Sequence, residues 1–150
     1  MKLAEALIER ADLKARIDQI VSRMRENALI QEGDTPAEDI VELCNMYESM
    51  MDELEGLITR INKTNAGTLL NDVSLAEVIA KRDCLKAKIS AYRTVKESSL
   101  TRRDRYSSSE IKYVRTTDIA KLQRIIDDYS KQYRELDTKI QERNWMAELL

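Results

Sequence analysis

Histidine and phenylalanine are absent from this sequence, glycine occurs three times and proline once. Without histidine, a Ser-His-Asp triad, a Cys-His pair and every histidine-ligated metal site are excluded. So little glycine and proline leaves few residues for the turns of a sandwich or barrel built from many short strands. These absences remove most all-β folds and several classes of enzyme.

Long hydrophobic runs are also missing. No apolar run approaches the roughly 20 residues that span a bilayer. Charges at Glu5, Glu9 and Arg10 interrupt the first turns, whereas a secretory signal needs an unbroken apolar stretch of at least about seven residues. We therefore expect a soluble, cytoplasmic protein without a membrane span.

The 150 residues are rich instead in charged side chains, at 35%, and in hydrophobic ones, at 43%. The hydrophobic fraction is too high for a disordered chain, and high charge with little glycine or proline is typical of long amphipathic helices. At this length a single domain spanning 1–150 is expected.

Apolar residues recur at spacings of three and four in four segments, which predicts helices over about 3–29, 36–61, 75–97 and 118–145. Thr35-Pro36-Ala37-Glu38 and Ser74-Leu75-Ala76-Glu77 both match a capping box at a helix start. The second predicted helix is apolar at about three positions in seven, so it should meet more than one neighbour. The fourth has the most regular stripe: Ile119, Leu122, Ile126, Tyr129, Tyr133, Leu136 and Ile140.

The predicted fold is all-α, with four long amphipathic helices in an antiparallel bundle or in coiled-coil hairpins. A short β pair between Leu69–Leu70 and Ile111–Val114 is also expected. In an antiparallel hairpin of the second and third helices, Cys44 and Cys84 would lie roughly 15 Å apart. A disulfide needs Cα atoms within about 7 Å, so both cysteines should be free.

Charge is segregated along the chain. Residues 26–59 hold ten acidic side chains and no basic ones, whereas residues 81–115 hold eleven basic and four acidic ones. The acidic helix could lie beside the basic one within the chain, or each could meet the other on a second subunit. Nucleic acid is a third interpretation, but the pI of about 5.4 argues against it. No nucleic-acid partner is therefore expected.

The candidate binding surfaces are two non-helical segments, Arg60–Asn65 and Arg102–Val114, because loops more often carry function than core positions do. Capping is the alternative role for the first of them, at the end of the second helix. No nucleophile lies beside an evident base, so no catalytic residue, metal site or cofactor is predicted. The candidate binding residues are Asn62, Thr64, Asn65, Arg102, Arg103, Arg105, Tyr106 and Lys112.

Several stretches together resemble one known family: MKLAEAL at 1–7, QEG at 31–33, RINKTN at 60–65, RYSSSEIKYV at 105–114 and LDTKIQERNW at 136–145. By these stretches the chain resembles the small bacterial septicolysin-like proteins over almost its whole length. The resemblance implies an all-helical protein of this size with no settled activity and no catalytic residues. The family name implies a cytolysin.

The function that we predict is that of a non-enzymatic helical bundle, which self-associates and acts as a binding or scaffolding module for an unknown protein partner. The wide apolar face of the second helix is the reason for expecting a homo-oligomer. A pore-forming cytolysin is the alternative that the resemblance implies. An enzyme that uses carboxylate, tyrosine or cysteine side chains is the third class.

Overall fold

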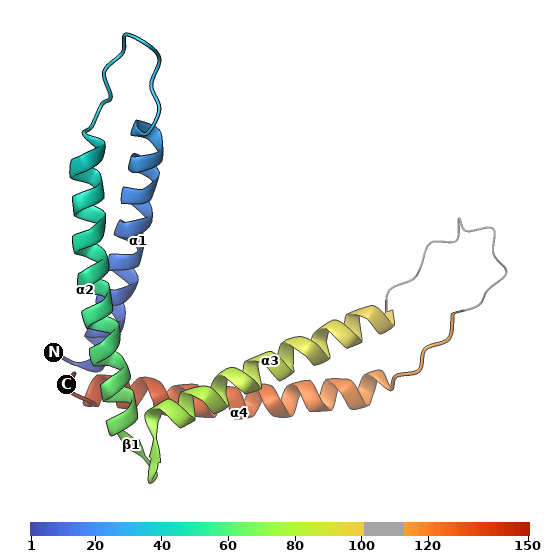
Figure 1. Cartoon of the computed structure of the whole chain (residues 1–150). Coiled ribbons are helices and arrows are strands. Elements are labelled where there is room, and N and C mark those ends of the chain that lie inside the picture. The colour runs from blue at the N-terminus through green and yellow to red at the C-terminus, as the bar shows by residue number, and fades with distance from the viewer. Residues whose placement is uncertain (101–112) are drawn as a thin grey trace, which may run out of the picture. The chain divides into compact units, whose positions relative to one another are not determined.

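The computed structural model describes residues 1–100 and 113–150, and over these residues the fold is all-α, as predicted (Figure 1). A two-residue strand pair is the sole sheet in this part of the chain. The elements in order are α1 (Leu3–Asn27), α2 (Ile40–Gly67), β1 (Leu69–Leu70), β2 (Val73–Ser74), α3 (Leu75–Leu100) and α4 (Ile119–Met146).

The β pair forms a tight hairpin between α2 and α3. β1 pairs antiparallel with β2, so that Leu69 faces Ser74. Asn71 and Asp72 form the turn with φ of 51° and 64°, the left-handed pair of a type I′ turn. The predicted partner of β1 is therefore wrong. A neighbour across a two-residue turn needs little loop closure, whereas Tyr113 and Val114 lie in no strand and residues 111–112 lie outside the described ones.

The structure divides into two compact units, whose boundaries fall inside α3 and α4. The α1–α2 unit comprises residues 1–76 and 141–150, and the α3–α4 unit comprises residues 77–140. The single domain spanning 1–150 stays a prediction.

In the α1–α2 unit, the two helices pack against each other through a core that includes Leu13, Ile17 and Leu54. The buried side chains of α2 are Leu43, Leu54, Leu57, Ile61 and Thr64. Much of the predicted stripe of α2 is only half-buried, because one neighbouring helix covers one part of a broad apolar face. These half-buried residues are Ile40, Cys44, Tyr47, Met51 and Ile58.

The connection between α1 and α2 corrects the first capping box. α2 begins at Ile40, and its N-cap is Asp39, whose Oδ1 accepts a 2.7 Å hydrogen bond from the Val41 amide. Glu38 does not cap the helix, because its carboxylate accepts from the Arg23 guanidinium, at 2.9 Å from Nε. The Glu38 amide donates to Asn27 Oδ1 at 3.0 Å. These contacts tie the end of α1 to the start of α2.

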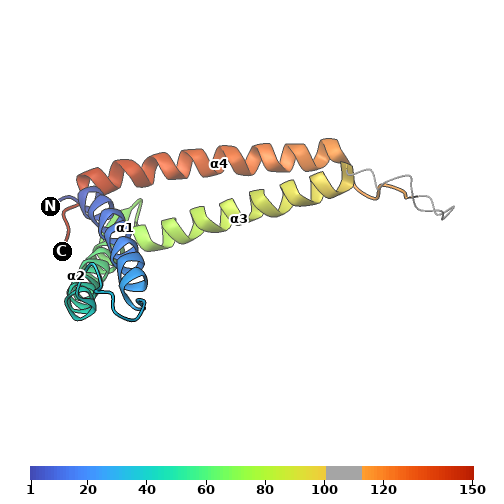
Figure 2. The same ribbon diagram turned by 90° about the horizontal axis from the view of Figure 1, so that it is seen from above.

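In the α3–α4 unit, the two helices lie side by side and antiparallel, as both views show (Figures 1 and 2). Arg82 Nη1 donates to Asp137 Oδ1 at 3.0 Å, the rings of Tyr92 and Tyr129 are 6.0 Å apart, and Lys96 Nζ donates to Gln123 Oε1 at 2.5 Å. The buried apolar side chains of the pair are Val78, Leu85, Ile89, Ile126 and Ile140. α3 begins directly after Ser74, as its capping signature predicted.

The acidic helix α2 and the basic helix α3 each pack against a helix other than the one expected from pairing acidic with basic. The acidic α2 packs against α1, and the basic α3 contacts α4 through the side-chain pairs Arg82–Asp137, Tyr92–Tyr129 and Lys96–Gln123. Both cysteines are free, as predicted, with Cys44 half-buried and Cys84 exposed.

Candidate functional site

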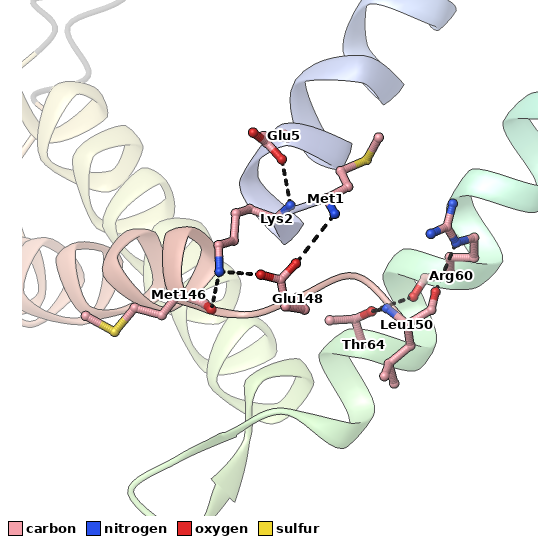
Figure 3. A network of polar contacts seen from close by, with 8 residues as sticks. All are labelled: Met1, Lys2, Glu5, Arg60, Thr64, Met146, Glu148 and Leu150. Atoms are coloured by element: carbon pink, nitrogen blue, oxygen red, sulfur yellow. Dashed lines mark hydrogen bonds and ion pairs between the residues drawn. The ribbon is translucent and has the colours of Figure 1, made fainter.

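The first candidate segment is helical, because α2 continues through Asn62 to Gly67 where the sequence predicted a break. Thr64 is 1% exposed. Its hydroxyl donates to the Arg60 carbonyl at 2.9 Å and accepts from the Leu150 amide at 3.0 Å (Figure 3). Thr64 thus holds the C-terminal segment, residues 147–150, against α2. Asn62, by contrast, is exposed.

The C-terminal segment also contacts the start of α1. The Leu3 amide donates to the Ala147 carbonyl, and the Leu149 amide to the Met1 carbonyl, both at 2.9 Å. Lys2 Nζ lies 2.5 Å from Glu148 Oε1 (Figure 3). This hydrogen bond from Lys2 lowers the pKa of the Glu148 carboxyl below its usual value, although partial desolvation opposes the shift. Backbone pairing and opposite charge therefore hold the two ends of the chain together.

Three buried polar atoms of the α1–α2 unit have no hydrogen-bond partner: Asn65 Oδ1, Arg143 Nε and Asn144 Oδ1. Asn65 is one of the predicted binding residues, and its Oδ1 can still accept a hydrogen bond. Arg143 and Asn144 lie in the last turns of α4, where the sequence offered no signal to separate them from solvent-facing polar residues. That Asn65 binds a partner stays a prediction.

The second candidate segment lies almost entirely outside the described residues. Arg102, Arg103, Arg105, Tyr106 and Lys112 all belong to residues 101–112. The prediction that they bind a partner is unchanged by the structure.

A groove between α3 and α4 is a third candidate, and its first part has a volume of about 630 Å³. The half-buried Tyr133 supplies apolar surface there, beside the buried Ile89. Arg93 and Arg134 line both this part and an adjoining one that extends toward the end of α3 at Leu100. Polar side chains line the rest: Lys86, Ser90, Thr94, Glu97 and Ser130 in the first part, and Lys96, Gln123 and Asp127 in the second.

The cations of this groove differ in whether they have partners. Lys96 is hydrogen-bonded to Gln123. In the described part of the chain, the side chains of Lys86, Arg93 and Arg134 have neither an ion pair nor a hydrogen bond. Guanidinium groups bind carboxylates through two parallel hydrogen bonds. The groove is therefore suited to an acidic partner with an apolar side.

The sequence located part of this site. Lys86, Arg93 and Lys96 belong to the basic stretch 81–115 that stood out in the charge pattern. Arg134 was missed, because α4 carries acidic and basic residues in mixture and nothing in its sequence marks one arginine. Only the pairing of α4 with α3 brings Arg134 to the same groove as Arg93.

The described residues contain no group of three or more cysteine or acidic side chains that could hold a metal ion. None of the described helices combines the length and the apolar character needed to cross a bilayer. The groove between α3 and α4 can therefore bind a partner through hydrogen bonds, charge and apolar contact.

Comparisons with known proteins show the family of the chain but assign no function. A model described as "Family of unknown function (DUF6847)" matches residues 10–149. A crystal structure of a functionally unknown conserved protein from Corynebacterium diphtheriae is 38% identical, with a TM-score of 0.90 over 100% of this chain and 99% of that one. Among curated proteins none matches. The resemblance to septicolysin-like proteins is not tested by these matches.

Proposed function

Because the chain belongs to the family of unknown function DUF6847, whose description assigns no activity, we propose a role from its surfaces alone. The protein is a non-enzymatic, self-associating helical module of the bacterial cytoplasm that binds or scaffolds a protein partner. The observation that carries this proposal is the incomplete cover of the apolar stripe on α4.

The α4 stripe has seven members, and α3 buries only a minority of them. Ile126 and Ile140 are at most 4% exposed. The other five, Ile119, Leu122, Tyr129, Tyr133 and Leu136, are half-buried. On α3, Val95 is 44% exposed. Two helices alone cannot enclose stripes of this width.

Further cover of these side chains stabilises an assembly. Burial of a leucine-sized side chain contributes about 1.5–3 kcal/mol when it is complete, and contiguous apolar surface is typical of sites where proteins meet. The half-buried flank of α2, with Cys44, Met51 and Ile58, adds apolar surface of the same kind. Self-association supplies the missing neighbours.

Two further observations support the rest of the proposal. The free thiols of Cys44 and Cys84 are typical of a reducing compartment, which favours the cytoplasm. The groove between α3 and α4 presents charge and apolar surface without a nucleophile paired to a base, which favours binding over catalysis.

Light scattering coupled to size exclusion tests self-association. We expect wild-type protein at about 10–100 µM to have a mass of at least two chains. Tyr133→Glu places a charge in the incompletely covered stripe of α4 and should lower the association constant about tenfold or more, because the carboxylate would have to be desolvated in the contact. Ala120→Glu, at an exposed position of α4, is the matched control and should associate as wild type does.

Circular dichroism should show the same helix content for both variants, which separates lost association from lost folding. A monodisperse monomer across the whole concentration range contradicts the proposal. Release of a trapped dye from liposomes by the purified protein would favour the pore-forming alternative instead.

A further inference from the structure

The two units have opposite net charge. The α3–α4 unit holds sixteen basic and ten acidic residues, a net charge of +6, whereas the α1–α2 unit holds nine basic and seventeen acidic residues, a net charge of −8. Two copies of the chain therefore attract each other when unlike units meet. Units of like charge repel each other, so the contact between unlike units is the favoured arrangement.

The basic side of such a contact is the α3–α4 groove. Lys86, Ser90, Arg93 and Glu97 follow one another at spacings of four, three and four along α3, so they share a face of the helix. Arg134 lines the same groove from α4. Glu97 is the acid of this face and is already engaged in a contact within its own chain. Lys86, Arg93 and Arg134 are left as the cations available to a partner.

The acidic side is a stripe on α2. Glu48, Asp52 and Glu55 lie at spacings of four and three, so they share a face, and all three are exposed. Among the apolar residues of α2, Met51 and Ile58 directly flank this stripe at helical spacing and are half-buried. The stripe therefore joins three carboxylates to an incompletely covered apolar flank.

The two stripes match in spacing. Lys86 and Arg93 are seven residues apart on α3, and Glu48 and Glu55 are seven residues apart on α2, which is about 10.5 Å along either axis. Tyr133, which is half-buried, supplies apolar surface in the groove beside the buried Ile89 and can contact the apolar flank that accompanies the acids. Carboxylates can thus meet cations at both ends of the contact while apolar groups meet between them.

We propose that the acidic stripe of one copy docks in the α3–α4 groove of a second copy of this chain. The interface consists of Glu48, Asp52 and Glu55 on α2 of one copy, and of Lys86, Arg93 and Arg134 on the other. It rests on the self-association proposed above and names the surfaces that carry it. The charged pairs select partner and register, and the half-buried side chains of Met51 and Ile58 meet the half-buried Tyr133 between them.

A charge swap between two variants of the full chain tests the interface. The groove variant carries Lys86→Glu, Arg93→Glu and Arg134→Glu, and the stripe variant carries Glu48→Lys, Asp52→Lys and Glu55→Lys. Each variant alone brings like charges together, so each should associate at least about tenfold more weakly than wild type. Mixed in equal amounts, they restore opposite charges at both contacts, and sedimentation velocity should show a heteromeric species again.

The matched control is Lys121→Glu with Lys131→Glu and Lys139→Glu. It changes the net charge as much as the groove variant does, at exposed positions of α4 outside the groove. It should associate at least about tenfold more strongly than the groove variant, which separates the site from net charge. Equal helix content by circular dichroism verifies that all variants fold.

The possible results separate the two proposals. Weakened variants, a control that associates more strongly than the groove variant, and recovery on mixing support the interface. Wild-type association that persists in both charge variants overturns this interface and leaves self-association standing. Weakened variants that do not recover on mixing also overturn it. Wild-type protein that is monomeric at about 100 µM overturns the interface together with self-association.

Discussion

At the scale of single residues, Thr64 shows how a side chain predicted to bind a ligand serves the fold. Its hydroxyl is buried between the Arg60 carbonyl and the Leu150 amide. A buried amide without an acceptor costs about 1–3 kcal/mol. The hydroxyl of Thr64 is therefore positioned to hold the end of the chain on α2.

Thr64→Val keeps the shape of the side chain and removes the hydroxyl. We expect the free energy of unfolding to fall by about 1–2 kcal/mol, measured by urea denaturation, because the Leu150 amide loses its acceptor. Thr64→Ser keeps the hydroxyl and should retain the hydrogen bond, so amide exchange at Leu150 should stay slow in this control alone. Equally fast exchange in both variants would show that Thr64 does not hold the C-terminal segment.

At the scale of elements, the start of α2 differs from the start that its local sequence predicts, because Glu38 makes a tertiary contact instead of capping the helix. Thr35 and Glu38 match a capping box in sequence. In the structure the Glu38 carboxylate accepts a hydrogen bond from the Arg23 guanidinium, and this bond lowers the pKa of the Glu38 carboxyl. The helix then begins two residues after Glu38, with Asp39 as its cap.

Replacement of the two candidate caps separates the alternatives. Asp39→Ala should lower the free energy of unfolding by about 1 kcal/mol, since the Val41 amide loses the carboxylate that accepts its hydrogen bond. Thr35→Ala should change it by no more than about 0.5 kcal/mol, the range of ordinary surface substitutions. The reverse order in urea denaturation would move the start of α2 back to the predicted box.

The sequence predicted the bounds of the helices better than it predicted which helices pack together. The observed start and end of α1, α3 and α4 lie within three residues of the predicted ones, because apolar periodicity is a local signal. The end of α2 was placed six residues too early, because Asn62, Asn65 and Gly67 are typical of breaks. Tertiary packing overrides such weak propensities, and here the C-terminal segment bonds to this last part of the helix.

At the scale of the whole molecule, the apolar stripes are broader than the cover that the described chain provides. Leu122 and Leu136 of α4 remain half-buried, as do Met51 and Ile58 of α2. If association buries these side chains, assembly is linked to folding, and apparent stability depends on protein concentration.

Thermal unfolding followed by circular dichroism measures this linkage. Between about 1 µM and 100 µM, we expect the wild-type Tm to rise by about 3–8 °C. Tyr133→Glu, which weakens the proposed contact, should show a smaller rise, and Ala120→Glu should match wild type. A wild-type Tm that is independent of concentration would mean that the folded chain needs no second copy.

What the sequence by itself determined is the helical class, the positions of the long helices and the segregation of charge, because periodicity and composition are properties of neighbouring residues. Only the tertiary structure decided that α1 covers α2, that Arg134 joins Arg93 in one groove, and that Thr64 holds Leu150. These residues are far apart in sequence, and their contacts arise from the packing of one amphipathic face on another, which several pairings of similar helices satisfy.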